Sequence, residues 1–490
     1  MIFSSWLFGS FFLVVFTAYW TLKTRRARHV LLLIASYVFY MSWNPWLVTL
    51  IIGSTVLDYL VGLSLGRTGS ARRRTGLLII SLVGNLGILA IFKYADFFIL
   101  SMRGLLESLG LQANMSTLSI ILPVGISFYT FQTMSYTIDI YRGKLTPTRS
   151  FLDFALFVAF FPQLVAGPIV KARDFLPQLE TLKKFSWENI DTGVVLFMVG
   201  LTKKVLIADQ LAHLVDPVFA DPTRFVTRDL WLAMFCYGGQ IYCDFSGYTD
   251  MAIAVALMLG FTLRPNFASP YLATSLTDFW HRWHISLSTW LRDYLYIPLG
   301  GSRVGRFLTY RNLLLVMLLG GLWHGASWTF VIWGAIHGTA LVISKIWTER
   351  TAGAPAGRGI GRYGSVVLGW ALTLLVVHVA WVFFRCQPVI AQGAVEPEPT
   401  VVALQRATYF VTHLFVPAEV QNPVWLMNKL PMMVLLGLMV CFQVYDEWTR
   451  RGRPRLRLPA PIAGVGYAAW ILALVILSPE NANPFIYFQF

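Results

Sequence analysis

The run Leu318-Leu-Gly-Gly-Leu-Trp-His-Gly-Ala-Ser-Trp-Thr-Phe330 joins two apolar segments of the chain, at about 311–323 and 327–347. Many other apolar runs approach the roughly 20 residues that a helix needs to cross the hydrocarbon of a bilayer. These runs are continuous rather than alternating, which argues against a transmembrane barrel. The pattern predicts an all-α, polytopic integral membrane protein with roughly 10–13 spanning or re-entrant helices.

The composition agrees with a membrane protein. Hydrophobic residues make up 56% of the 490 residues, charged residues make up 13%, and the mean hydropathy is +0.62. A soluble protein carries about 25% charged residues. The formal net charge of +15 would suggest nucleic acid as a partner of a soluble protein. Here the cations gather in short loops between apolar segments, as cytoplasmic loops do, so we expect lipid and no nucleic acid as partner.

The apolar segments follow one another with short loops, which favours a single membrane domain over residues 1–490. Within it we expect N-terminal helices at 1–150, a core with re-entrant and interfacial helices at 151–347, and C-terminal helices at 348–490 with an external loop at 385–430. The stretch 151–168 is short and broken by proline, so it is expected to be re-entrant and covered by protein. The signs of the loops place both termini outside.

His324 lies near the end of an apolar run, among the small residues Gly320, Gly321 and Gly325. Small residues allow another backbone or a substrate to approach closely. An ionisable side chain at membrane depth is costly, so it is a functional-site hypothesis by default. The alternative is a histidine that a neighbouring helix satisfies. His337 lies between glycines and is better explained by helix packing than by chemistry.

The segment 269–312 carries too many charges for a helix that faces lipid, and it is rich in tryptophan and tyrosine. This combination predicts an amphipathic helix at the interface or along a water-filled funnel, capped by Ser275 or Thr277. On one continuous helix His281, His284 and Ser288 share a face. An interfacial anchor with hydrogen-bonded histidines explains the same pattern. The spacing offers no third ligand for a metal, and the four cysteines form no CxxC pair, so no metal is expected.

A third feature is Gln240-Ile-Tyr-Cys-Asp-Phe-Ser-Gly-Tyr-Thr-Asp250, where Asp244 and Ser246 interrupt an apolar stretch. A buried carboxylate must be paired or neutral. Asp244 is expected either to orient a catalytic group or to pair with an arginine such as Arg282 or Arg292. We favour the second, structural role.

Three stretches together resemble the membrane-bound O-acyltransferase family: Tyr242-Cys-Asp-Phe-Ser-Gly-Tyr-Thr-Asp-Met-Ala, the segment from Phe279-Trp-His-Arg-Trp-His to Tyr296-Ile, and Gly320-Gly-Leu-Trp-His-Gly-Ala. Leu122-Pro-Val-Gly-Ile-Ser-Phe-Tyr, Phe161-Pro-Gln-Leu-Val-Ala-Gly-Pro and the ending Phe-Ile-Tyr-Phe-Gln-Phe add support. The likeness covers nearly the whole chain. It is stronger to the bacterial members that acetylate alginate than to those that transfer D-alanine to teichoic acids. His281 stands where those alginate members are expected to have arginine.

The resemblance implies a ring of tilted helices around a central tunnel, with His324 and His284 as the catalytic pair. A positioned histidine could take the proton of a hydroxyl that attacks a thioester, a contribution of about 10²–10⁴ in rate. His324 is the candidate base, and His284 would donate to the thioester oxygen or position the acceptor. The residues expected to bind substrate or support this pair are Trp323, Trp283, Arg282, His281, Ser288, Arg292, Asp293, Tyr294, Asn312, Gln240, Asp244 and Ser246.

The expected reaction moves acetyl groups from a cytoplasmic thioester donor, acetyl-CoA or an acylated carrier protein, across the inner membrane. The expected acceptor is an exported, alginate-like polysaccharide, reached through a periplasmic partner protein that transfers the acetyl group. Another polymer is an alternative, through acetylation of cellulose or D-alanylation of teichoic acid. From other classes, a transporter with a histidine proton relay and a non-catalytic scaffold also remain open.

Overall fold

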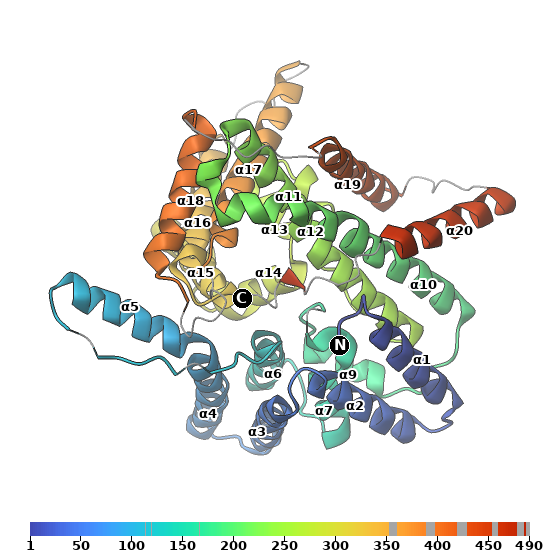
Figure 1. Ribbon diagram of the computed structural model, residues 1–490. Helices are drawn as coiled ribbons and strands as arrows, with labels where there is room; N and C mark the ends of the chain where they lie inside the picture. Colours follow the sequence, from blue (N-terminus) through green and yellow to red (C-terminus); the bar gives the residue numbers. More distant parts are fainter. Residues whose placement is uncertain are drawn as a thin grey trace. The chain divides into compact units, whose positions relative to one another are not determined.

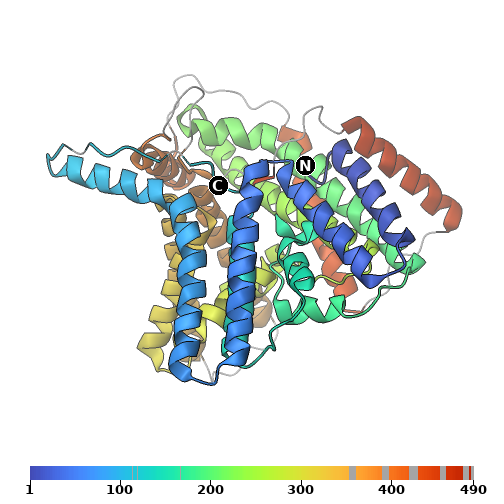
Figure 2. The ribbon, with the colours of Figure 1, turned by 90° about the horizontal axis from the view of Figure 1, so that it is seen from below.

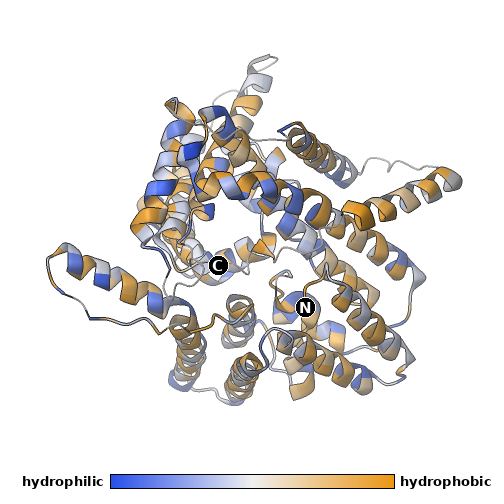
Figure 3. Cartoon of the chain, viewed as in Figure 1, coloured by the Kyte–Doolittle hydropathy of each residue, from blue (hydrophilic) through white to orange (hydrophobic). Residues whose placement is uncertain are grey.

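The computed structural model describes the whole chain except residues 113, 119, 166, 352–359, 389–396, 419–428, 453–458, 478–484 and 487–490. The described residues form α-helices with short 3-10 and π turns, and no strand occurs among them (Figure 1). Five helical stretches among them are long and apolar enough to cross a membrane: 45–67, 71–108, 328–351, 363–385 and 429–450. Figure 3 shows how strongly hydrophobic residues dominate α20 (Ala460–Leu477). The expected class, an all-α polytopic membrane protein, is confirmed.

The chain forms two compact units, and each is described by itself. Unit 1 holds residues 1–200 and 248–265, and unit 2 holds residues 201–247 and 266–490. Two of the three boundaries fall within helices α10 (Trp187–Thr202) and α12 (Thr227–Met258), which therefore contribute residues to both units. The candidate residues around the two histidines all belong to unit 2.

Unit 1 is built from helices that follow one another through short turns. Figure 2 shows α3 (Val48–Arg67) and α4 (Ala71–Leu89) lying side by side, and both contact α6 (Ile126–Tyr141). Where the three meet, the buried Asp58 carboxylate accepts hydrogen bonds from Ser81, Asn85 and Thr137. Besides these three and its parts of α10 and α12, the unit holds α1 (Trp6–Thr21), α2 (Arg25–Met41), η1 (Pro45–Leu47), η2 (Ala90–Tyr94), α5 (Ala95–Ser108), α7 (Phe151–Ala159), α8 (Phe161–Leu164) and α9 (Ala172–Leu179).

The proline-broken stretch of unit 1 is short, and protein covers its central part. Residues from Phe154 to Phe161 are 0% exposed, in α7 and at the start of α8. Helix α7 contacts α2, where the imidazole of His29 lies 2.7 Å from the carboxylate of Asp153. The backbone groups of such a broken stretch need protein partners inside a membrane, and Ser36 of α2 supplies one by accepting from the Phe161 N–H. The expected protein cover is therefore present at residues 154–161, whereas Phe151 at the start of the stretch is 43% exposed.

Unit 2 contains the segments that carry the sequence motifs. Its elements are η3 (Lys203–Ala208), α11 (Asp209–Ala220), η4 (Pro222–Arg224), the first part of α12, η5 (Pro270–Leu272), α13 (Leu276–Arg282), α14 (Ile285–Leu291), η6 (Arg292–Tyr296), α15 (Arg306–His324), α16 (Trp328–Thr351), α17 (Ile360–Arg385), α18 (Thr400–Phe415), α19 (Lys429–Arg450) and α20.

Helices α15 and α16 pack backbone against backbone, and glycines make this approach possible. A Cβ on Gly334 would collide with the carbonyl oxygen of Met317, and a Cβ on Gly321 would collide with that of Phe330. The small residues beside His324 therefore have the predicted role. Because α15 ends at His324 and α16 begins at Trp328, this close contact also fixes where the histidine lies.

The stretch 385–430 was expected to be an external loop, yet it contains helix α18. Ala403, Ala407, Phe410 and Leu414 of this helix are buried, at the spacing of one helical face. That periodicity was visible in the sequence, so reading the whole stretch as a loop was wrong for residues 400–415. Its flanks at 389–396 and 419–428 lie outside the described residues.

The close contact at Gly334 predicts that a larger residue there lowers the stability of the protein. We expect Gly334→Ala to destabilise the protein by about 1–3 kcal/mol, because the added methyl meets a backbone carbonyl that cannot rotate away. Thermal unfolding in detergent measures this loss. Gly437→Ala on α19, where nothing lies within 4 Å of the added Cβ, is the matched control. Equal melting temperatures for the two variants would contradict the packing argument.

Candidate active site

The segment that was expected to form one amphipathic helix is broken at the second histidine. Helix α13 begins after its predicted cap Ser275, whose side chain accepts from the N–H of Asp278, and it ends at Arg282. His284 then adopts a left-handed backbone with φ of 44°, and α14 begins at Ile285. The prediction of one helical face shared by His281, His284 and Ser288 was therefore wrong. Such a conformation costs a non-glycine residue about 1–3 kcal/mol and is held only where its surroundings impose it.

Asn266 imposes this turn. Its backbone carbonyl accepts from the N–H of Ile285 at 2.9 Å, and its side-chain oxygen accepts from the N–H and the hydroxyl of Ser286 at 3.1 and 2.9 Å. The same oxygen lies 3.3 Å from Nδ1 of His284. Because this oxygen can only accept, Nδ1 of His284 carries the proton, and Nε2 is then the accepting nitrogen of the ring.

The turn brings His284 to His324. Both side chains are buried, and their ring centroids lie 6.4 Å apart. The indole of Trp323 contacts both imidazoles, at 5.9 Å from His284 and 5.1 Å from His324. The structure therefore joins the two candidate catalytic residues, which are 40 positions apart in the sequence, inside one aromatic cluster.

Aromatic rings enclose the two imidazoles on further sides. Phe245 packs edge-on against His284 at 4.7 Å. Trp333 and Phe384 pack against His324 at 5.0 and 5.2 Å. Such a lining lowers the local polarity and restricts water, which would otherwise hydrolyse an activated acyl group.

Asp244 pairs with a lysine and not with either of the arginines that were expected. Its carboxylate lies 2.6 Å from the ammonium of Lys204, which also lies 2.9 Å from the carboxylate of Asp209. The second oxygen of Asp244 accepts from the backbone N–H of Ile486 at 2.7 Å. All three charged groups are buried, so the ion pairs compensate charges that water does not reach. Asp244 thus ties η3, α11 and α12 to the chain near its C-terminus.

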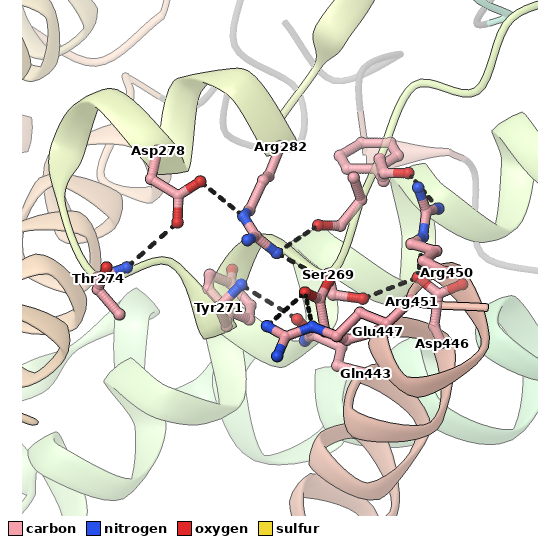
Figure 4. A network of polar contacts seen from close by, with 12 residues as sticks. Ser269, Tyr271, Thr274, Asp278, Arg282, Gln443, Asp446, Glu447, Arg450 and Arg451 are labelled. Carbon is pink, nitrogen blue, oxygen red and sulfur yellow. Dashed lines mark hydrogen bonds and ion pairs between the residues drawn. The ribbon is translucent and has the colours of Figure 1, made fainter. Parts of the chain in front are cut away.

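The two arginines have other partners. Arg282 forms ion pairs with Asp278 at 2.8 Å and with Glu447 of α19 at 3.0 Å, as Figure 4 shows. In the same network the hydroxyl of Ser269 donates to Asp446 at 2.7 Å. These contacts attach α19 to the segment that leads into the His284 turn. Arg292 pairs with the adjacent Asp293 at 2.9 Å and its side chain is largely exposed.

The other expected supporting residues differ in burial and in their contacts. Trp283 is fully buried against Phe279 and Trp381, and Ser246 is buried one residue beyond Phe245. Tyr294 packs on Trp290, Ser288 donates to the carbonyl of Trp283, and Gln240 is half-buried on α12. His281 is exposed, and Asn312 donates to the carbonyls of Leu299 and Gly301, where it shapes the turn before α15. Among the expected supporting residues, the ring of Trp323 contacts both imidazoles, whereas Arg292 and Asn312 have partners elsewhere.

Sequence reasoning missed Asn266, Lys204, Trp333 and Phe384. Asn266 precedes an unremarkable Phe-Ala-Ser-Pro stretch, and nothing in its spacing relates it to His284. Lys204 follows Lys203 at the end of an apolar run, where it reads as an ordinary cytoplasmic cation. Trp333 was visible as part of the apolar run after His324, but its contact with the imidazole depends on how α16 packs.

Burial controls the ionisation of His284, which lies outside the candidate spans. It lowers the pKa of the imidazole to about 3, well below its usual 6.5. The ring is therefore neutral at pH 7. A neutral imidazole with its proton on Nδ1 can accept a hydrogen bond from a hydroxyl group at Nε2.

An all-α membrane protein with two buried, neighbouring imidazoles in an aromatic enclosure fits the class of membrane-embedded acyl-transfer enzymes. Comparison with known proteins gives the family. Residues 144–383 match the membrane-bound O-acyltransferase family. A probable alginate O-acetylase AlgI of Pseudomonas putida is 41% identical over 513 aligned residues, which cover 100% of both chains.

Two further relatives extend the comparison. A probable alginate O-acetylase AlgI of Pseudomonas syringae pv. tomato is 47% identical over 80% of this chain and 74% of its own length. A peptidoglycan O-acetyltransferase of Helicobacter pylori is 40% identical over 73% of this chain and 70% of its own length. The chain therefore belongs to the membrane-bound O-acyltransferase family. It is a multi-pass membrane protein and an acyltransferase.

The buried cluster around Lys204 predicts a large loss of stability when it is broken. We expect Lys204→Met to cost about 3–5 kcal/mol, because two buried carboxylates lose their shared cation. Arg264→Met is the control, since Arg264 pairs with Asp174 at 3.2 Å but its side chain is 76% exposed. Thermal unfolding in detergent compares the two, and a similar small loss in both variants would refute the assignment.

The pKa of His284 predicts how the stability of the protein depends on pH. Below about pH 6.5 the unfolded chain takes up a proton at this imidazole. The folded site does not do so until the pH approaches 3. His284 therefore lowers the free energy of unfolding by about 1.4 kcal/mol for each pH unit below 6.5. We expect His284→Gln to lose less stability than the wild type between pH 7 and pH 5, measured by thermal unfolding, and parallel curves would contradict this.

Proposed function

We propose that the chain transfers acetyl groups from a cytoplasmic thioester donor to the periplasmic side of a bacterial inner membrane, for O-acetylation of an exported, alginate-like polysaccharide. One observation carries the chemistry: His284 and His324 lie with ring centroids 6.4 Å apart inside a buried aromatic cluster. The names of the relatives support acetyl as the acyl group and alginate as the class of polymer. A periplasmic partner protein would receive the acetyl group and pass it to the polysaccharide.

The two histidines take different parts in this proposal. The hydroxyl oxygen of the acceptor forms a bond to the acyl carbon, the bond from that carbon to sulfur breaks, and the thiol leaves. His324 takes the hydroxyl proton and returns it to the departing sulfur. Of the two roles expected for His284, its tautomer favours positioning the acceptor hydroxyl over donating to the thioester oxygen, because the Nδ1 proton already faces Asn266.

The direction of transfer follows from the distribution of charge. Basic residues cluster in the loops around 67–74 and 449–457, which the positive-inside rule assigns to the cytoplasm. The phosphates of coenzyme A or of an acidic carrier protein would meet these cations on that side. The same rule gives periplasmic termini and a periplasmic exit for the acetyl group.

The test is replacement of His324. We expect His324→Ala to lower acetylation by about 10²-fold or more at normal membrane abundance, because the base for the acceptor hydroxyl is lost. Acetate released from the exported polysaccharide by mild alkali measures the product. His413→Ala is the control, because the imidazole of His413 contacts its own helix: its Nδ1 lies 2.8 Å from the carbonyl oxygen of Tyr409.

Retention of acetylation by His324→Ala would contradict the proposal. So would a purified chain that drives ion flux and consumes no thioester, since that behaviour belongs to a transporter. Reconstitution of the full chain in vesicles with acetyl-CoA, and separately with an acetylated carrier protein, identifies the donor by the rate at which free thiol appears.

A further inference from the structure

Unit 2 contains a second buried group of polar rings beside the histidine pair. The imidazole of His337 is 0% exposed and contacts the indoles of Trp333 and Trp280, with centroids at 4.8 and 5.1 Å. The two indoles contact each other at 5.7 Å. Trp333 also packs on His324 at 5.0 Å, so this group is continuous with the candidate base.

The nitrogens of these three rings lack protein partners. Among the described residues, neither ring nitrogen of His337 has a hydrogen-bond partner, and the same holds for the buried indole nitrogens of Trp280 and Trp333. By contrast, Nδ1 of the buried His378 in the same unit lies 2.8 Å from the carbonyl of Leu374. A buried polar atom without a partner costs about 1–3 kcal/mol. Three such rings in mutual contact indicate a place where a ligand completes the hydrogen bonding.

Packing alone does not explain His337. The glycines on either side of it, Gly334 and Gly338, face Met317 and Leu314 of α15 and account for the contact between the two helices. The imidazole instead faces α13, where it stacks on Phe279 at 6.2 Å and meets Trp280. A phenylalanine would fill this position without burying two polar nitrogens.

An amide can use two of the donors of this group and its one acceptor. Each indole N–H donates, and a neutral imidazole supplies one donor and one acceptor, so the group offers three donors and one acceptor. The oxygen of a secondary amide accepts two hydrogen bonds, and its N–H donates one. The depth of the rings selects a narrow, unbranched ligand, since His337 and Trp333 are 0% and 1% exposed and a polysaccharide chain would not fit between them.

We propose that His337, Trp280 and Trp333 form a subsite for the first amide of the pantetheine arm of the thioester donor. Two methylene groups separate the nitrogen of that amide from the thioester sulfur. The amide and the reacting carbon are therefore close enough to meet side chains that contact the same ring. His324 and His337 both contact the indole of Trp333, with ring centroids at 5.0 and 4.8 Å. Acetyl-CoA and an acylated carrier protein both present this arm. The inference rests on the proposed function and adds a specificity-determining residue, His337, to it.

Truncated thioesters test the subsite in the full-length, reconstituted protein. S-acetyl-N-acetylcysteamine has the first amide of the arm, and S-ethyl thioacetate has none. We expect the wild type to prefer the amide-containing thioester by about tenfold in kcat/KM for thiol release, a difference that one or two hydrogen bonds produce. His337→Leu should abolish this preference and raise KM for acetyl-CoA, and Trp280→Phe should weaken the preference while retaining the ring.

His378→Leu is the matched control, because it removes another buried imidazole of unit 2 and should keep the wild-type preference. The inference is overturned if the wild type shows no preference, or if His337→Leu keeps it, which would mean that the nitrogens hold ordered water only. Loss of folded protein in His337→Leu is checked with His337→Gln, which retains a donor and an acceptor and should restore part of the preference.

The proposed function fails in a different way. In that case wild-type protein releases no thiol from any thioester, or His324→Ala releases it at the wild-type rate. Acetyl-CoA and the acetylated carrier are also compared as donors for His337→Leu. Both should lose the same factor in kcat/KM if the amide, which both donors carry, is the group that is recognised.

Discussion

The strained backbone at His284 is the constraint on which the candidate site depends. A histidine at φ of 44° interrupts α13 and α14, and Asn266 holds the interruption with its backbone and side-chain oxygens. A continuous helix would place His284 and His281 on one face, and His281 is exposed. The break instead turns His284 inward, to Trp323 and His324. The hydrogen bonds of Asn266 therefore offset the backbone strain and also select the ring tautomer.

The second requirement is the close approach of α15 and α16. Gly321 and Gly334 let the two backbones touch, which brings His324 at the end of α15 against Trp333 on α16. A larger residue at either glycine would move the base and the aromatic wall apart. The packing of α15 on α16 therefore sets the position of His324 relative to Trp333, and a change in this packing changes the geometry of the site.

Much of this arrangement could be predicted from the sequence, because its signals are local. Continuous apolar runs predicted the all-α membrane class, glycines beside His324 predicted close packing, and Ser275 was among the expected caps. The break at His284 could not be predicted, because no glycine or proline marks it and its cause is Asn266, 18 positions earlier. The partner of Asp244 was missed for a similar reason: Lys203 and Lys204 are both buried, and the sequence does not reveal which of them pairs with a carboxylate 40 positions later. Helix α18 was missed although its apolar residues recur at helical spacing, because the acidic residues and prolines that precede it are typical of a loop.

Buried polar groups of unit 2 are of two kinds: charged side chains that are paired within the protein, and ring nitrogens that are not. Where a charge serves the fold, it is paired: Lys204 joins two carboxylates, and Arg282 joins Asp278 to Glu447. Around His337 the nitrogens of three rings remain without protein partners among the described residues, although apolar rings of the same shape would pack as well. In the subsite that we propose, these nitrogens gain hydrogen bonds only when the ligand binds, and that free energy then holds the ligand near His324. A site that spends stability in this way favours bound substrate over empty enzyme, because the missing hydrogen bonds form only in the complex.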